Sequence, residues 1–196
     1  MGYRPSKNYW TTKPVDSFIG EDGKARCGWC SADPQYIDYH DREWGREVKG
    51  DDAVFERISL EGFQAGLNWL MILKRREHLR SVFRNFSIKA VSKMGEKDIE
   101  LLMQDQLVIR NRRKITSVIE NAKVLANSEG SISDLVWSFQ PKSNPQDHTR
   151  TKSSESEALS KELKRLGLAF VGPTTMYAMM QSIGMVNDHH PNCYLR

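Results

Sequence analysis

Apolar residues recur every three or four positions through most of this chain, and no other feature of the sequence restricts the fold as much. The spacing begins at Asp51 and repeats in residues 95–109, 112–130 and 131–139. Side chains with this period form one face of an α-helix, whereas strands need a period of two, which the sequence does not sustain. The pattern therefore predicts an all-α protein of several helices.

Glycine and proline mark the expected ends of the helices. In residues 51–83, where an aspartate supplies the N-cap, Gly62 and Gly66 predict a break between two helices. Gly130 stands where a helix stop is expected. Residues 140–154 contain two prolines and mostly polar side chains, which predicts a long polar loop over the surface.

The segment LGLAFVGPTT joins two further predicted helices through a short turn. Gly167 stops the helix that begins at Ser154, and Gly172 with Pro173 starts the next helix, whose first turn includes Thr174. Such a hairpin can present backbone N–H groups and a helix N-terminus to a phosphate. An ordinary αα-hairpin has the same pattern, so these residues alone leave both interpretations open.

Length and composition predict one compact domain. The chain has 196 residues, of which 39% are hydrophobic, and five tryptophans, enough apolar surface to offset the entropy lost on folding. Residues 1–24 are polar and lack a helical period, which predicts a flexible N-terminal arm ahead of a single helical domain over residues 25–196. The net charge of +4 is too small to identify an acidic partner by itself.

The sequence has no feature of a membrane or secreted protein. No run of eighteen residues is apolar, which excludes a transmembrane helix. The first residues contain no apolar stretch of signal-peptide length, so we expect a cytoplasmic protein with no membrane partner. In that reducing compartment the three cysteines are expected to form no disulfide.

The cysteines lie at opposite ends of the chain. Cys27 and Cys30 form a CxxC pair, and Cys193 follows two histidines. A redox CxxC is expected inside a βαβ pattern, which this sequence lacks. A zinc site needs four nitrogen or sulfur ligands, so histidines must complete it, although buried thiols and solvated histidines would explain the same residues. The candidate histidines are His40, His189 and His190.

Several ordered blocks carry a resemblance to a known family. They read RCGWCSADPQYIDYHDREWG, LEGFQAGLNWLMILKRRE, LVWSF and LKRLGLAFVGPTTMYAMMQSIGMVNDH, followed by Cys193. From about Arg26 onward the chain resembles the 3-methyladenine DNA glycosylase I family. The resemblance implies a helix-hairpin-helix DNA glycosylase fold with a structural zinc that joins the N- and C-terminal segments. The ligands it implies are Cys27, His40, His189 and Cys193, with no role for Cys30.

The same resemblance implies a set of residues that act on DNA. Glu61 would be the catalytic residue, and Gly66 with Leu67 would form a wedge in the gap left by a flipped nucleotide. Gly167, Gly172 and Thr174 belong to the hairpin that would hold the DNA backbone. Taken singly, each aromatic residue fits a core position as well as a pocket. The implied base-binding residues are Trp29, Tyr36, Tyr39, Trp44 and Trp69.

The function implied is monofunctional excision of 3-methyladenine from double-stranded alkylated DNA by a monomeric enzyme, with free 3-methyladenine as product. Methylation at N3 gives the base a positive charge, which a buried carboxylate would stabilise. Asp188 is a secondary candidate for catalysis, and residues 74–80 and 110–114 supply basic side chains for phosphates. The alternative is a non-catalytic, zinc-stabilised DNA-binding module, which would need neither Glu61 nor the aromatic set.

Overall fold

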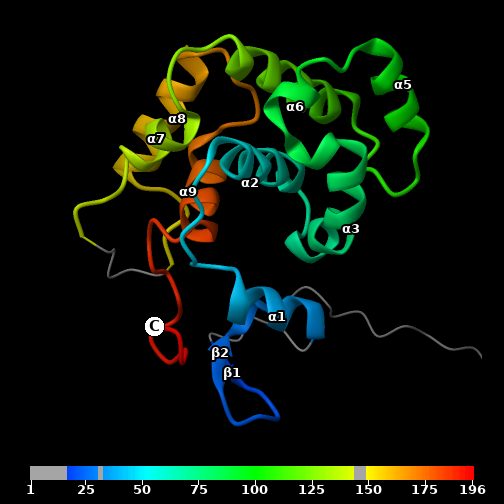
Figure 1. The fold of residues 1–196 in the computed structure, drawn as a ribbon. Helices are drawn as coiled ribbons and strands as arrows, with labels where there is room; N and C mark the ends of the chain where they lie inside the picture. Colours follow the sequence, from blue (N-terminus) through cyan, green and yellow to red (C-terminus); the bar gives the residue numbers. More distant parts are fainter. Residues whose placement is uncertain (1–16, 31–32, 144–148) are drawn as a thin grey trace, which may run out of the picture.

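A computed structural model describes residues 17–30, 33–143 and 149–196, and most of these lie in helices (Figure 1). The prediction of a mainly helical protein is therefore confirmed, with one small sheet in addition. The α-helices are α1 (Pro34–Arg42), α2 (Asp51–Gln64), α3 (Trp69–Val82), α4 (Ile88–Val91), α5 (Glu96–Gln104), α6 (Arg112–Ala126), α7 (Ile132–Trp137), α8 (Ser154–Arg165) and α9 (Pro173–Ser182). Two 3-10 helices are η1 (Gly28–Cys30) and η2 (Arg84–Phe86), and the strands are β1 (Ser17–Ile19) and β2 (Ala25–Cys27).

The two strands form an antiparallel hairpin in a region where the sequence predicted part of a flexible arm. Three residues per strand are too few for an alternating pattern, so the sequence carries no strand signal there. The buried Arg26 side chain holds the hairpin in place, because its guanidinium bonds Asp22 at 2.7 Å and Asp41 of α1 at 2.7 Å. The arm prediction is therefore wrong for residues 17–24, and residues 1–16 lie outside the described part of the chain.

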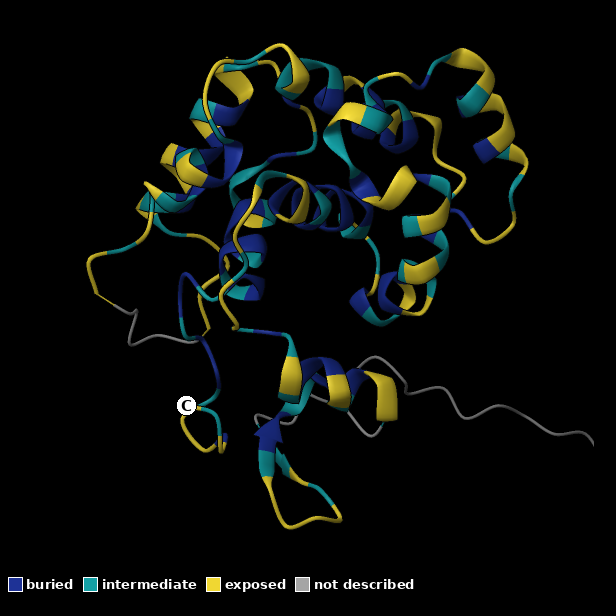
Figure 2. Cartoon of the chain, in the orientation of Figure 1, coloured by how far each residue is buried: buried dark blue, intermediate teal, exposed yellow. Residues whose placement is uncertain are grey.

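Helix α2 runs through the centre of the helical body and is buried on two sides (Figure 2). Phe55 and Phe63 belong to an apolar cluster shared with α3, α5 and α6. Val54 and Ile58 belong to a second cluster shared with α7, α8 and α9. A polar residue on α2 is therefore surrounded by apolar groups unless a cavity opens beside it.

The break between α2 and α3 falls at Gly66, as the sequence predicts, but Gly62 lies inside α2. Gly66 has a φ of 78°, a left-handed conformation that favours glycine, and Asn68 caps α3 by accepting a hydrogen bond from the Leu70 amide at 2.8 Å. Gly62 instead allows Phe170 to pack closely, since a Cβ built at Gly62 would lie 3.3 Å from the Cβ of Phe170. The prediction that Gly62 ends a helix is wrong because the glycine serves close packing against the α8–α9 connection.

The second half of the chain agrees with the predicted order of loop, helix, turn and helix. Residues 140–143 and 149–153, the described parts of the predicted loop, contain no helix or strand. Ser153 caps α8 by accepting a hydrogen bond from the amide of Ser156 at 3.2 Å. Helices α8 and α9 then pack side by side as a hairpin. Nowhere in the described residues is there a helix long and apolar enough to span a membrane.

The segment that follows α9 returns to the strands. It passes α1 and ends beside β2, where the Tyr194 amide donates a hydrogen bond to the Ala25 carbonyl at 2.9 Å (Figure 1). In Figure 1 this segment, α1 and the strands lie together on one side of the helical body, facing α2, α3 and α9. Residues from both ends of the described chain thus meet on this side of the molecule (Figure 1).

Candidate active site and metal centre

A cavity of about 200 Å³ lies between α1 and the helical body. It brings together Glu61 and all five aromatic residues that the sequence analysis assigned to a base pocket. Asp188, the secondary candidate, reaches the same cavity. The lining residues are Trp29, Tyr36, Tyr39, Trp44, Glu61, Gln64, Trp69, Ala178, Gln181 and Asp188.

The aromatic residues of the cavity walls come from four short segments of the chain. Tyr36 and Tyr39 stand three residues apart on α1, so they share one face of that helix. The Trp29 ring in η1 lies 5.1 Å from Tyr36 and 4.9 Å from Trp44, measured between centroids. Tyr39 lies 5.4 Å from Trp69, the first residue of α3. These are the spacings of tilted and edge-to-face aromatic pairs, so the walls support one another.

Glu61 is the buried acid of the cavity. Only 4% of the residue is exposed, and within the described chain its carboxyl group makes no hydrogen bond. Burial raises its pKa to about 8, and the nearby Arg57 guanidinium opposes that shift. In the empty cavity the neutral acid is therefore favoured near pH 7, whereas a cation beside it would favour the carboxylate.

Asp188 presents a second acid whose two oxygens differ. Its Oδ2 accepts hydrogen bonds from the Tyr177 hydroxyl at 2.7 Å and from the Gln181 amide at 2.8 Å. Its Oδ1 is buried without a partner, and so is the Nε1 donor of Trp69. Since both residues line the cavity, it offers a ligand one free acceptor and one free donor.

Sequence reasoning missed two polar lining residues, Gln64 and Gln181. Gln64 lies three positions after Glu61 on α2, so helical periodicity places it on the same face and offered a signal. Gln181 comes from α9, and only the packing of α9 against α2 brings it to the cavity. No local pattern in the sequence predicts that contact.

The turn after α2 runs beside the cavity. Gly66 is exposed and Leu67 is half-buried. The Leu67 amide donates to the Gln64 carbonyl at 2.6 Å, while the side-chain amide of Gln64 donates back to the Leu67 carbonyl at 3.4 Å. The residues expected to form a wedge therefore lie next to a lining residue, Gln64.

The hairpin residues form a separate group outside the cavity lining. Gly167, with a φ of 98°, ends α8, and Gly172 is the N-cap of α9. Pro173 and Thr174 are the first two residues of α9, at the end of a helix where amides lack internal partners. The geometry suits an anion at this end, because the helix dipole is positive there.

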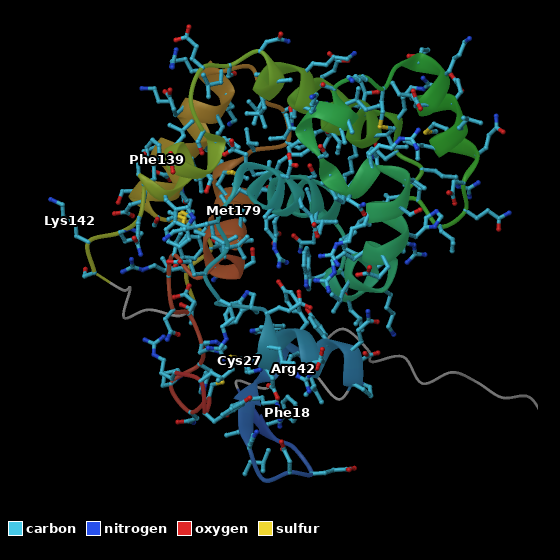
Figure 3. All side chains as sticks on the ribbon, viewed as in Figure 1. Phe18, Cys27, Arg42, Phe139, Lys142 and Met179 are labelled. Atoms are coloured by element: carbon cyan, nitrogen blue, oxygen red, sulfur yellow. The ribbon has the colours of Figure 1, made fainter. Side chains whose placement is uncertain are left out.

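Four buried side chains from opposite ends of the chain form a compact cluster. Cys27, His40, His189 and Cys193 each offer a ligand atom, and these atoms all lie within 4.8 Å of one another. The Sγ of Cys193 is 3.5 Å from Nε2 of His40 and 3.5 Å from Nδ1 of His189, which is also 3.6 Å from the Sγ of Cys27. Figure 3 shows Cys27 beside the C-terminal segment. The cluster is of a kind that holds a metal ion.

Neighbouring groups orient the cluster. Asp41 accepts from Nδ1 of His40 at 2.8 Å, which leaves Nε2 facing Cys193, and Arg26 fixes that carboxylate in turn. Burial lowers the pKa of His40, and it lowers the pKa of His189 to about 4, so both rings are neutral near pH 7, as metal ligands must be. Cys30 lies outside the cluster.

Cys30 packs instead of binding a metal, in agreement with the family resemblance. It is fully buried, and its thiol donates a hydrogen bond to the Cys27 carbonyl at 3.1 Å. The three cysteines of the chain are free of disulfides. Cys30 therefore packs outside the cluster, against the carbonyl of Cys27 at the end of β2.

Three of the six arginines in the two basic segments, residues 74–80 and 110–114, pair with glutamates within the protein. Arg76 bonds Glu43 at 2.6 Å, Arg80 bonds Glu56 at 2.8 Å and Arg112 bonds Glu96 at 2.6 Å. The Lys114 amine is turned inward. These residues already have partners within the protein, and the expectation that the two segments bind phosphates stays a prediction.

Comparison with known proteins agrees with this geometry. The sequence profile of the Methyladenine glycosylase family matches residues 29–196. The chain is 45% identical over 177 residues to DNA-3-methyladenine glycosylase 1 of Escherichia coli K12, an alignment that covers 86% of this chain and 95% of the relative.

Two solved structures have the same fold. The crystal structure of a 3-methyladenine DNA glycosylase I (TAG) is 42% identical, with a TM-score of 0.80 over 86% of this chain and 98% of the other. A Staphylococcus aureus 3-methyladenine DNA glycosylase I, studied for its recognition of 3-methyladenine, is 29% identical, with a TM-score of 0.78 over 84% and 92%. By sequence and by fold, this chain belongs to the methyladenine glycosylase family.

Proposed function

We propose that this protein excises 3-methyladenine from alkylated double-stranded DNA by hydrolysing the bond between the base and its sugar. The observation that carries the proposal is the aromatic cavity closed by Glu61, a buried acid without a hydrogen bond in the described chain. A module that only binds the DNA backbone does not require a buried acid, because burying one is unfavourable. The relatives named above support the choice of 3-methyladenine.

The cavity walls suit a base that has left the stack. Enzymes that act on a base must extrude it from the duplex and hold it between aromatic side chains. Trp69 is the proposed stacking platform, with Tyr36, Tyr39, Trp29 and Trp44 around it. The acceptor at Asp188 Oδ1 remains for the polar edge of the base.

Glu61 would act by charge, without serving as a strong general acid. A base methylated at N3 is cationic, so its entry would convert Glu61 to the carboxylate, which then accepts N–H groups of the base. When the C1′–N9 bond breaks, its electron pair leaves with the base and neutralises it. A water oxygen bonds C1′ of the sugar and gives up a proton, which leaves free 3-methyladenine and an abasic site.

Two loops beside the cavity would contact the DNA. Leu67, next to Gly66 in the exposed turn after α2, would fill the gap left by the flipped nucleotide. Gly167, Gly172 and Thr174 shape the α8–α9 hairpin, whose backbone amides would hold a phosphate as a helix-hairpin-helix element. We propose that these elements act within a monomer.

The buried cluster would hold a structural Zn²⁺. A tetrahedral zinc with a Zn–S bond of about 2.3 Å and a Zn–N bond of about 2.1 Å separates sulfur from nitrogen by about 3.6 Å. Three of the four sulfur–nitrogen distances in the cluster are 3.5, 3.5 and 3.6 Å, and all its ligand atoms lie within 4.8 Å of one another, so the residues fit the ion. Four protein ligands leave no open position, which is typical of a zinc that stabilises a fold.

Release of the base from methylated duplex DNA tests the function directly. Purified protein is mixed with duplex DNA that carries labelled methylated bases, and the released bases are separated by chromatography. We expect 3-methyladenine to appear in proportion to enzyme, together with abasic sites. Binding of the duplex without release of any base would instead support the non-catalytic module.

A further inference from the structure

Besides Ser117, helix α6 has two buried polar side chains that the functions proposed above do not use. They are Lys114, of which 7% is exposed, and Asn121, of which 3% is exposed. The two lie seven positions apart, so they share one face of α6. Each makes its hydrogen bonds to the backbone of a loop that is expected to touch DNA.

Lys114 stands where a lysine is unfavourable for its own helix. It lies in the first turn of α6, after the N-cap Asn111, and a cation at a helix N-terminus is opposed by the dipole. Its amine instead donates to the Phe63 carbonyl at 2.8 Å and to the Ala65 carbonyl at 2.6 Å. These carbonyls belong to the C-terminal end of α2, where a cation is favourable.

The two bonds of Lys114 fix the point at which the chain leaves α2. Ala65 is the C-cap of α2, and Gly66 and Leu67 follow it directly. Burial also lowers the pKa of the amine. The course of the exposed turn is therefore determined from inside the protein by α6.

Asn121 makes the corresponding contact with the hairpin. Asparagine is a poor residue for the interior of a helix, and a buried amide needs partners. Its side-chain amide donates to the Ala169 carbonyl at 3.0 Å, and its carbonyl oxygen accepts from the Ala169 amide at 2.8 Å. Ala169 lies midway through the connection between Gly167 and Gly172, so the reciprocal pair fixes the connection itself.

We propose that α6 sets the position of both DNA-contacting loops, with Lys114 as positioning residue for the 65–67 turn and Asn121 as positioning residue for the 167–172 connection. The inference rests on the proposed function of these loops. Because the turn acts on the flipped nucleotide and the connection on the backbone, loss of each bond affects a different parameter. Lys114 governs the rate within the bound complex, and Asn121 governs the affinity for DNA.

The test compares Lys114→Met and Asn121→Leu, which keep side-chain volume but remove the hydrogen bonds. Glu120→Gln, at an exposed position of α6, and Asn127→Ala, at the exposed C-cap of that helix, are the controls. Three quantities are measured for each protein: single-turnover release of 3-methyladenine at saturating enzyme, the Kd for a duplex with an abasic-site analogue, and the Kd for free 3-methyladenine. The last reports whether the cavity is intact.

For Lys114→Met we expect a release rate about tenfold to a hundredfold lower, as small misplacements of a loop can cause, with the free-base Kd unchanged. For Asn121→Leu we expect a duplex Kd about tenfold weaker, with the release rate at saturation unchanged. Both controls should match the wild-type protein. If Lys114→Met does not fold by circular dichroism, Lys114→Gln is judged by the same comparison.

The inference is overturned if both variants change the same parameter by the same factor, or if the free-base Kd weakens in parallel with the release rate. Unchanged values for both variants overturn it as well. These results differ from a failure of the proposed function, in which the wild-type protein itself would release no 3-methyladenine.

Discussion

The proposed function makes Glu61 the residue on which catalysis depends, because a cation in the cavity would favour its carboxylate. Replacement by glutamine keeps the size of the side chain but removes the charge. Gln64, three residues further along α2, links the same cavity to the Leu67 backbone. Replacing one atom of Glu61 would therefore change the charge in the cavity, with little change in packing.

Glu61→Gln should slow single-turnover release of 3-methyladenine by about tenfold to a thousandfold. The lower part of that range is expected because the methylated base is already a good leaving group. Glu77→Gln, on the exposed surface of α3, is the control and should retain the wild-type rate. If folded Glu61→Gln released the base at the wild-type rate, the acid required for catalysis would have to be sought at Asp188.

The same substitution should alter the pH dependence of stability. The pKa of Glu61 is raised to about 8 in the folded protein, so between its ordinary pKa and that value the folded state binds the extra proton. Wild-type stability should therefore fall as pH rises through this window, whereas Glu61→Gln lacks this loss. Melting temperatures from pH 5 to pH 9 should show the variant gaining on the wild type, and parallel curves would contradict the burial assigned to Glu61.

The chemistry of the residues and their resemblance to a family identified the aromatic residues, Glu61 and Asp188. They did not identify the two glutamines that also line the cavity. Tyr36 and Tyr39, or Glu61 and Gln64, share a helix face that periodicity determines. Gln181 and Asp188 meet through a 2.8 Å hydrogen bond that depends on how the chain turns after α9. Such contacts between segments leave no trace in a local pattern.

At the scale of elements, the close contact between α2 and the α8–α9 connection joins the base cavity to the hairpin. Gly62 permits this contact and is the neighbour of Glu61 in the chain. The sequence pattern treated Gly62 as a helix stop, because a glycine in a helix is unfavourable unless packing requires it. The requirement came from Phe170, more than a hundred residues away in the sequence.

Gly62→Val should destabilise the protein and weaken its binding to duplex DNA. The new Cβ would lie 3.3 Å from the Cβ of Phe170, and the two branches of valine would crowd it further, so the connection must move. We expect a melting temperature lower by roughly 2 to 8 °C, for a loss of about 1 to 2 kcal/mol. Gly95→Ala, at a position with open space, is the control, and equal losses in both would refute the packing argument.

The small β-hairpin is the element that no periodicity predicted. Its strands are three residues long, and its stability comes from Arg26, which is 4% exposed and bridges Asp22 and Asp41. The contacts of a buried arginine with two carboxylates form only when the chain folds. The sequence therefore shows no more than three separate charged residues. The helices of the same protein were predictable because each carries its own apolar face.

At the scale of the whole molecule, the metal cluster joins segments 162 residues apart. One segment carries α1 with Tyr36 and Tyr39, and the other carries Asp188. If the cluster holds the proposed zinc, loss of the ion would release two walls of the cavity together. The fold and the base site would then depend on one small group of ligands.

Cys27→Ser and Cys193→Ser should each lower the zinc content and the melting temperature together, since the remaining ligands no longer close a tetrahedral site. Cys30→Ser is the matched control, because Cys30 is equally buried but lies outside the cluster. Metal content by elemental analysis and unfolding by calorimetry check both effects. Absence of zinc from freshly purified wild-type protein, or a larger loss in Cys30→Ser, would overturn the ligand set.

The order of the ligands along the chain also affects how the protein is made. Cys27 and His40 precede α2, whereas His189 and Cys193 follow α9. During synthesis Cys27 and His40 therefore leave the ribosome before α2 to α9. They cannot meet the other two residues of the cluster until the end of the chain has been made. A chain that ended before His189 would keep all five aromatic residues of the cavity but lose two of the four proposed ligands, so it could not close the metal site.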